Sequence, residues 1–246
     1  MAASTTSVET QPRYEDVLAH LPASKTTKYD KGQTIYGVDK HSTGIYLVRT
    51  GKVGVSHVAE DGTEVLMEIV KPDELFGESA FLNVPRRAER ATAIETAQLM
   101  TWAIADIEGL VTKRPRLAVA LLQILVQRNA EYTRRIESFA VDSIERRLAR
   151  SLIRFSERLG TREQGGSVRM MPLTHEMLGR YVGTSREIVS HYMNRFRKRG
   201  YVSYSRHGII LYRDTLHKVL DGSAVLSADG TGQETYAVPQ DVPAEE

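Results

Sequence analysis

The chain has 246 residues, of which 41% are hydrophobic and 26% are charged, the proportions of an ordinary soluble globular protein. It contains no cysteine, which excludes disulfide bonds, thiol nucleophiles, and zinc or iron–sulfur sites with thiolate ligands. The longest nearly apolar stretch, 117–126, is about half the ~20 residues of a membrane-spanning helix. The first 13 residues lack the pattern of a secretory signal, so we expect a cytoplasmic protein with no membrane partner.

Charge is unevenly distributed along the chain, although its net value is only +2. The segment 174–220 carries nine lysines and arginines, three acidic residues and four histidines, a net charge of +6. The segment 221–246 carries six acidic residues and neither lysine nor arginine. A basic module beside an acidic tail favours a nucleic-acid partner, and a solvated surface is the alternative reading of the charge alone.

The N-terminal half has the pattern of short strands. Residues 1–22 begin polar and rich in serine and threonine, and we expect a flexible arm there. From 23 to 112, brief apolar runs alternate with turn residues such as Gly44, Gly51 and Gly62. This pattern predicts an antiparallel, jelly-roll-like barrel or sandwich.

A helical pattern follows. Apolar residues recur at helical spacing from Leu117 to Phe139, and there is no glycine or proline between Arg116 and Leu159. We expect one long helix and hinge over 113–141, then a break near 141–143, where Asp142 or Ser143 can cap a second helix. Gly165-Gly166 is expected to end the helical stretch.

The long helix is expected to form a dimer seam. A helix of ~25 residues spans about 37 Å and outreaches a small barrel. Part of its apolar stripe therefore needs another partner, and a second copy of the chain is the simplest one. The alternative is that the stripe packs wholly within one molecule.

The region 142–220 has the pattern of a winged helix-turn-helix, and the acidic segment 221–246 is expected to be a disordered tail. A short turn containing Gly183 joins two helices, and a hairpin follows the second of them. The expected elements are a strand at 167–171, helices at 174–181 and 185–199, and strands at 201–205 and 209–212.

The second of these helices is the candidate recognition helix. Thr184 and Glu187 have the spacing of a capping box that marks its start. In its first turns Arg186 can bind guanine O6 and N7, and Glu187 can accept a hydrogen bond from cytosine N4. Four basic residues further along the helix are expected to contact phosphates: Arg195, Arg197, Lys198 and Arg199. The residues expected to face inward are Leu173, Met177, Leu178, Ile188, Val189, Tyr192 and Phe196. The candidate DNA-binding residues are Thr174, Ser185, Arg186, Glu187, Ser190, His191, Arg195, Lys198 and Arg206.

Three stretches, VGTSREIVSHYMNRFRKRGYV, YLVRTGKVGV and DELFGESAFLNVPRRAERATA, resemble the Crp/Fnr family of bacterial transcription regulators in order and spacing. The resemblance covers about 27–220. It implies an α+β chain with an N-terminal antiparallel β-roll that binds cyclic nucleotides, a long dimerisation helix and a C-terminal winged helix-turn-helix. It also implies a homodimer on a palindromic DNA operator that acts with RNA polymerase and is not an enzyme. A protein-binding scaffold that does not bind DNA is the remote alternative.

The same resemblance places an effector in the roll, with cAMP or another cyclic nucleotide as the possible ligand. Glu78 would bind the ribose and Arg87 the phosphate, with Arg86 and Arg90 as alternatives if a loop length differs. The full candidate set is Gly77, Glu78, Ser79, Arg87, Ala88 and Thr133.

The sequence departs from the bacterial cAMP receptors at several of these positions. Ala88 stands where those receptors carry serine or threonine, Glu89 is acidic, and Tyr132 precedes Thr133. The alternative is therefore a degenerate pocket that acts without a cyclic nucleotide or senses another ligand. His41 and His57 are conceivable haem ligands, although lone histidines in turns are usually solvated. No catalytic or metal-binding set is expected.

Overall fold

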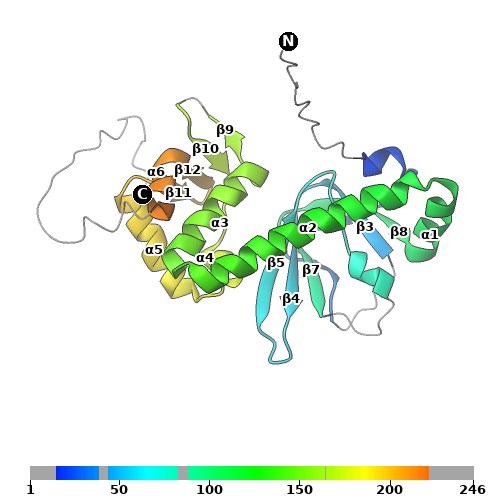
Figure 1. The fold of residues 1–246 in the computed structure, drawn as a ribbon, viewed down its shortest axis with the longest axis horizontal. Coiled ribbons are helices and arrows are strands. Elements are labelled where there is room, and N and C mark those ends of the chain that lie inside the picture. Colours follow the sequence, from blue (N-terminus) through cyan, green and yellow to red (C-terminus); the bar gives the residue numbers. More distant parts are fainter. Residues whose placement is uncertain (1–14, 39–43, 83–87, 164, 222–246) are drawn as a thin grey trace, which may run out of the picture. The chain divides into compact units, whose positions relative to one another are not determined.

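The computed structural model describes residues 15–38, 44–82, 88–163 and 165–221 (Figure 1). The predictions for 1–14, His41, Arg86, Arg87 and 222–246 lie outside these residues. The chain divides into two compact units. The first comprises Met1–Val53, Val70–Arg87 and Thr92–Arg135, and the second comprises Gly54–Ile69, Ala88–Ala91 and Ile136–Glu246.

One antiparallel sheet of the N-terminal part joins four strands in the order β1-β8-β3-β6. Ile45 lies opposite Trp102 in the central β3–β8 pair, and both side chains are buried in one cluster with Leu47. Ile107 of the following helix is buried in the same cluster. The strands are β1 (Thr26–Tyr29), β3 (Gly44–Thr50), β6 (Leu75–Phe76) and β8 (Ala97–Ala103).

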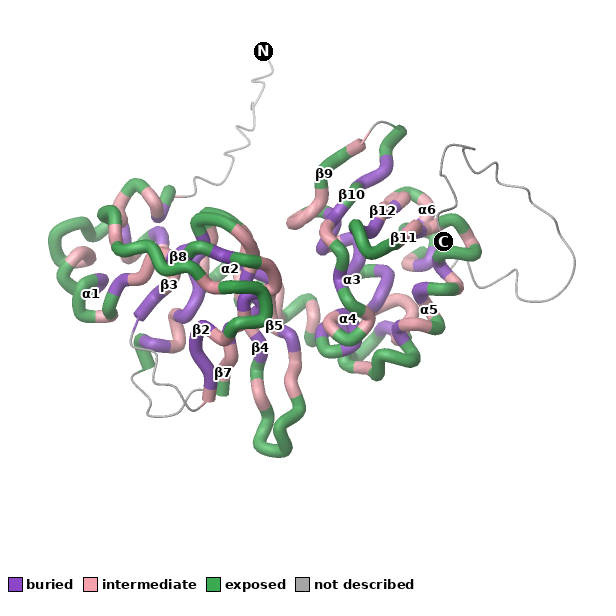
Figure 2. Tube along the Cα trace, turned by 180° about the vertical axis from the view of Figure 1, so that it is seen from behind, coloured by how far each residue is buried: buried purple, intermediate pink, exposed green. Residues whose placement is uncertain are grey.

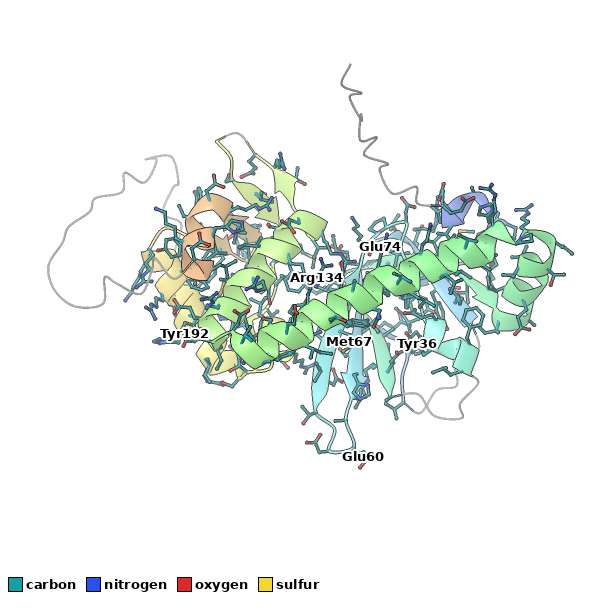
Figure 3. The ribbon with its side chains drawn as sticks, in the orientation of Figure 1. Tyr36, Glu60, Met67, Glu74, Arg134 and Tyr192 are labelled. Atoms are coloured by element: carbon teal, nitrogen blue, oxygen red, sulfur yellow. The ribbon has the colours of Figure 1, made fainter. Side chains whose placement is uncertain are left out.

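A second sheet has the strand order β2-β7-β4-β5. From β3 onward the chain passes repeatedly between the two sheets, which is the connectivity of a roll rather than of a simple meander. Glu60, labelled in Figure 3, lies at the turn between β4 and β5. The predicted antiparallel β-roll is therefore confirmed. The strands are β2 (Thr34–Tyr36), β4 (Val53–Val58), β5 (Glu64–Val70) and β7 (Glu89–Ala93).

Part of the expected N-terminal arm is packed. Val17, in the 3-10 helix η1 (Val17–Ala19), is buried in the cluster that holds Trp102. The indole Nε1 of Trp102 donates a hydrogen bond of 3.2 Å to the carbonyl oxygen of Pro22. The packed part of the chain thus begins before residue 23, the position at which the sequence predicts that the roll starts.

Gly51, in the turn between β3 and β4, provides a test of the roll. Its φ is +79°, and a Cβ there would lie 2.3 Å from the Thr96 carbonyl oxygen. We expect Gly51→Ala to lower the free energy of unfolding by about 2–5 kcal/mol, because backbone strain and a clash with backbone act together.

Gly62 is the matched control for this variant. Its φ is +83°, and no described atom lies within 4 Å of its Cβ position. Gly62→Ala should therefore cost only about 1–2 kcal/mol. Urea denaturation measures the free energy of unfolding of both variants. If both lost the same amount, the close approach of the Thr96 backbone to Gly51 would not be the cause of the destabilisation.

The helical stretch breaks where the sequence predicts. The Ser143 hydroxyl accepts a hydrogen bond of 3.4 Å from the backbone N–H of Arg146 and so caps the second helix. That helix stops before Gly160, so the end predicted at Gly165-Gly166 is wrong. A Cβ at Gly160 would lie 2.3 Å from Cγ1 of Val168, because the strand that begins at Val168 packs closely against the helix end. The helices are α1 (Ile104–Lys113), α2 (Arg116–Val141) and α3 (Ile144–Leu159).

The C-terminal part is the predicted winged helix-turn-helix. Its antiparallel sheet has the strand order β11-β12-β10-β9 and packs with α3 and α5. The helices are α4 (His175–Val182), α5 (Arg186–Lys198) and α6 (Arg213–Leu220). The strands are β9 (Thr161–Arg162), β10 (Val168–Met170), β11 (Val202–Ser205) and β12 (Gly208–Leu211).

The buried face of α5 differs from the predicted one. Val189 and Phe196 are buried as expected, but Met193 completes the face. Ile188 is 39% exposed, and Tyr192 is only half-buried. Positions 189, 193 and 196 repeat at three- and four-residue intervals and share one side of a helix, and Ile188 lies about 100° away from Val189 around the axis. On the preceding segment, Leu173 and Leu178 are buried and Met177 is half-buried.

Candidate nucleic-acid interface and ligand site

The turn between α4 and α5 is tight and depends on glycine. The Thr174 hydroxyl caps α4 by accepting a hydrogen bond of 3.1 Å from the backbone N–H of Met177. Gly183 ends α4 with φ +70°, and a Cβ there would lie 2.9 Å from the Phe139 ring. The left-handed turn at Gly183 sets the direction in which α5 leaves the motif.

The cap of α5 is Ser185 and not Thr184, so the predicted capping box is wrong. The Ser185 hydroxyl accepts a hydrogen bond of 3.3 Å from the backbone N–H of Ile188. The first helical residue is Arg186, one position later than a Thr184 cap implies. Hydrogen bonds to the Glu187 backbone N–H and to Ser185 lower the pKa of Glu187, so this carboxylate is ionised at neutral pH.

The predicted DNA-binding residues divide into two groups. Ser190 is half-buried, and its hydroxyl contacts its own helix and His175. Arg195 is half-buried, and its Nη1 lies 3.3 Å from Oε2 of Glu145 on α3. The remaining predicted residues are exposed to solvent: Thr174, Ser185, Arg186, Glu187, His191, Lys198 and Arg206.

The strand β11 is tied to α5 by contacts that the sequence analysis missed. The hydroxyl of Tyr204 donates a hydrogen bond of 3.0 Å to Oδ1 of Asn194. The guanidinium of Arg197 lies over the Tyr204 ring, 5.3 Å from its centroid. Arg206 follows at the turn after this strand, so these contacts fix the strand that presents it.

A buried carboxylate lies at the junction of α2 and α3. Asp142 accepts hydrogen bonds from Ser138 Oγ at 2.8 Å, from Arg150 Nε at 3.0 Å and from Arg146 Nε at 3.2 Å. Burial alone would raise the pKa of Asp142, but the hydrogen bonds from Arg150 and Ser138 outweigh burial and lower it. The break between the two helices was predicted at this place, but no pattern in the sequence indicated this cluster.

This cluster leads to a pH-dependent prediction. The folded pKa of Asp142 lies below its ordinary value of 3.8, so its stabilisation is present at neutral pH and is lost as the pH falls through the folded pKa. We expect Asp142→Asn to lower the free energy of unfolding by about 1–3 kcal/mol at pH 7, and the difference from the parent chain to shrink below about pH 4.

Urea denaturation at several pH values measures this effect. Glu137→Gln removes an exposed carboxylate five residues away and is the control. A difference between the Asp142→Asn variant and the parent chain that stayed constant with pH would contradict the assignment.

The first unit holds most of the described candidates for ligand binding. Gly77 has φ +87°, and a Cβ there would lie 3.0 Å from the Tyr46 ring. Glu78 begins the 3-10 helix η2 (Glu78–Leu82), which also contains Ser79. The Glu78 carboxylate lies 2.5 Å from Nη1 of Arg128 on α2, and the other end of the Arg128 fork donates to the carbonyl oxygen of Leu75.

Arg128 is a site residue that the sequence analysis did not identify. Its side chain is only 11% exposed, and it fixes the orientation of Glu78. An ionised carboxylate has about four lone-pair positions, so Glu78 can accept a hydrogen bond from a ligand hydroxyl while it remains paired. The only sequence signal was an arginine within the predicted long helix, and nothing local related it to a residue 50 positions earlier.

The other predicted ligand-binding residues make contacts outside the Glu78–Arg128 pair. Thr133 is exposed on α2, and its hydroxyl donates to the carbonyl oxygen of Asn129 at 3.0 Å. The backbone carbonyl of Ala88 accepts a hydrogen bond of 2.6 Å from Val58. Arg90, the alternative phosphate ligand, pairs with Glu64.

The described residues give little sign of a metal or haem centre. His57 is an exposed residue of β4. Within 15–38, 44–82, 88–163 and 165–221, no three His, Asp or Glu side chains gather as a metal site would require. No helix of this described part is both long and apolar enough to cross a membrane.

The long helix α2 has two kinds of apolar residue. Leu117 and Ala120 are buried, with Leu121 and Ile124 packed against the same cluster. Much of the remaining helix is exposed (Figure 2). The predicted stripe therefore packs partly within the molecule and leaves a second set of apolar side chains exposed to different degrees, of which Phe139 lies beneath the Arg147 guanidinium. The exposed apolar residues of α2 are Val119, Leu122, Leu125, Val126, Ile136, Phe139 and Val141.

Fold and site together define a DNA-binding protein in which a winged helix-turn-helix follows a roll of the cyclic-nucleotide-binding type. Two family models match the chain: the cyclic nucleotide-binding domain over residues 26–114 and the Crp-like helix-turn-helix domain over residues 146–219. The chain belongs to the Crp/Fnr family of transcriptional regulators, which are not enzymes.

Individual relatives agree with this assignment. The chain is 30% identical to the transcriptional regulator SdrP of Thermus thermophilus over 182 residues, which are 72% of this chain and 85% of that protein. It is 26% identical over 184 residues to the CRP-like cAMP-activated global transcriptional regulator of Mycobacterium tuberculosis, with 74% and 82% covered. The solved structure of TTHA1359, a CRP/FNR family regulator also from Thermus thermophilus, has a TM-score of 0.64 and 28% identity, and the match covers 80% of this chain and 98% of that one.

Proposed function

We propose that this protein is a cytoplasmic homodimer that binds a palindromic DNA operator and regulates transcription with RNA polymerase under the control of an effector in the β-roll. The observation that carries the proposal is the exposure of Ser185, Arg186, Glu187 and His191 in the first two turns of α5. In helix-turn-helix proteins these turns enter the major groove, where each good base contact contributes about 1–3 kcal/mol of discrimination.

The uncovered apolar side chains of α2 support the dimer. Val119, Leu122 and Val126 recur at intervals of three and four residues and so form one stripe. Two such stripes packed together would remove these side chains from water. The recognition helices of the dimer would then contact half-sites about 34 Å apart, one turn of DNA.

The pairing of Glu78 with Arg128 supports a cyclic nucleotide as the effector. The cation holds the carboxylate in place, and the neighbouring Gly77 backbone has the positive φ typical of loops that approach a phosphate. The Mycobacterium tuberculosis relative is described as cAMP-activated, which makes cAMP the first ligand to test.

A regulator that does not use a cyclic nucleotide is the second candidate. The Thr133 hydroxyl is already bonded to its own helix, and Ala88 has no side-chain donor. One of the solved structures with this fold is described as a c-di-GMP-responsive global regulator. Several nucleotides are therefore tested as candidate effectors, and not cAMP alone.

The full-length protein is first used to select its operator from random double-stranded DNA. Thermal shift is then measured with cAMP, cGMP and c-di-GMP, because a ligand at 100 times its Kd stabilises by about 2.7 kcal/mol. We expect one compound to raise the melting temperature and to change operator affinity, and Glu78→Gln to weaken both effects. No response to any of the three compounds would favour the second candidate.

Salt dependence separates a DNA-binding regulator from a protein-binding scaffold. Contacts to several phosphates make the logarithm of the binding constant fall steeply with the logarithm of the salt concentration. Failure to select any sequence, together with weak binding that depends little on salt, would contradict DNA binding as the function.

A further inference from the structure

The Ser190 hydroxyl on α5 has two close polar neighbours. Its Oγ lies 2.8 Å from the Arg186 carbonyl oxygen, one turn earlier on the same helix. It also lies 2.8 Å from Nδ1 of His175, the first residue of α4. Ser190 therefore links the two helices of the motif one turn after the Arg186 that the proposed function assigns to base reading.

The two distances, taken with the donors and acceptors available, indicate where the protons lie. A hydroxyl has one hydrogen, and a carbonyl oxygen has none to give. Two oxygens 2.8 Å apart need a hydrogen between them, so the Ser190 hydrogen points to the Arg186 carbonyl. The second contact can then be a hydrogen bond only if Nδ1 of His175 carries its own hydrogen and donates it to Ser190.

We propose that His175 is a positioning residue that holds the Ser190 hydroxyl in the orientation in which it can only accept a hydrogen bond from DNA. This inference rests on the proposed function. With its hydrogen committed to Arg186 and one lone pair taken by His175, Ser190 can offer a base only its second lone pair. In the major groove the matching donors are the amino groups of adenine N6 and cytosine N4. Guanine and thymine present acceptors to a hydroxyl there, so Ser190 would discriminate against them.

The surroundings of His175 hold the imidazole in this role. The edge of the ring meets Tyr204 of β11, with centroids 5.5 Å apart and planes at 72°. Tyr204 is itself held by Asn194 and lies under Arg197. The imidazole therefore contacts both α5, through Ser190, and β11, through Tyr204.

The charge state of His175 is consistent with one ring hydrogen. Burial lowers the pKa of His175, and the positive charge of Arg186 lowers it further. Tyr204, whose ring meets the imidazole, is a further titratable group beside it, and Arg197 lies over that tyrosine ring. The lowered pKa favours a neutral imidazole at neutral pH, and the proposed bond to Ser190 requires its hydrogen on Nδ1. Protonation would add a hydrogen at Nε2 and leave the Nδ1–H bond to Ser190 intact, so the base preference should not change between pH 5 and 8.

Operator selection with full-length variants tests the proposal. We expect the parent chain to prefer adenine or cytosine about three- to tenfold at one position of each half-site, the range of a single neutral hydrogen bond. Ser190→Ala and His175→Phe should both lose this preference. His175→Asn should keep it, because the asparagine amide can donate from nearly the same place as Nδ1. His217→Asn, at an exposed histidine of α6, is the control and should also keep it.

Two results would overturn the proposal while leaving the proposed function intact. One is a His175→Phe variant that selects the same base at every position as the parent chain. The other is a preference that reverses as the pH falls through the His175 titration, since that would mean Ser190 donates to Nδ1. The ¹⁵N chemical shifts of the imidazole in the free protein are an independent measurement, and an Nε2–H form would also refute the proposal. Failure of the parent chain to select any site would overturn the proposed function as well.

Discussion

Replacing both Leu122 and Val126 by glutamate is expected to convert the proposed dimer into monomers. Their side chains are 60% and 67% exposed in the single chain, on the uncovered stripe of α2. Each buried leucine or valine contributes about 1.5–3 kcal/mol, so four such side chains across a symmetric seam contribute about 6 kcal/mol or more. The dimer Kd should rise by roughly four powers of ten, and sedimentation at micromolar concentration would then detect monomers.

Operator binding should weaken together with the dimer. A monomer contacts only one half-site, so we expect affinity for the palindrome to fall by at least about 100-fold. Gln127→Glu adds one glutamate, half the charge of the double variant, at an exposed polar position on the same helix and should leave both properties nearly unchanged. A variant at Leu122 and Val126 that stayed dimeric would show that this stripe is not the seam.

The second large effect is expected at Arg186. Removing a base-reading arginine costs about 1–3 kcal/mol at one half-site, so Arg186→Ala should cost a dimer on a palindrome about 2–6 kcal/mol. The preference should also flatten at one base pair of each half-site, because the exposed guanidinium is the group that can bind guanine O6 and N7 together. Affinity titration and site selection measure the two effects.

Lys198→Ala is the matched control for Arg186. Lys198 is exposed in the last turn of α5, where a phosphate contact would add affinity without sequence choice. Its loss should weaken binding to all sequences alike and reduce the salt slope by about one. The same selected motif with and without Arg186 would refute the assignment of Arg186 as a base reader.

Local sequence patterns predicted the roll and the winged helix because their periodicity is a local property. Alternation with turn glycines is enough to indicate strands, and three- and four-residue spacing is enough to indicate helices. The break after Val141 was also predictable, since the capping serine is adjacent to it. The exact ends of the helices were not predictable. The start of α5 was misplaced by one residue because Thr184 and Ser185 are both good capping residues.

The contacts that define the site were not predictable in the same way. Glu78 and Arg128 are 50 residues apart in sequence, and His175 and Ser190 are 15 apart. Arg195 carries the same charge as Arg197 and Lys198 on the same helix, yet only the packing of α3 against α5 brings it to Glu145. A linear pattern gives the chemical type of a side chain but not the partner that meets it.

The sequence by itself determined the order of the elements, the basic recognition helix and the membership in a family of regulators, because these follow from composition, spacing and motif. Only the tertiary structure decided which polar groups are exposed and which are already paired. Hydrogen bonds act over about 3 Å, and residues distant in sequence come that close only when the helices and strands pack.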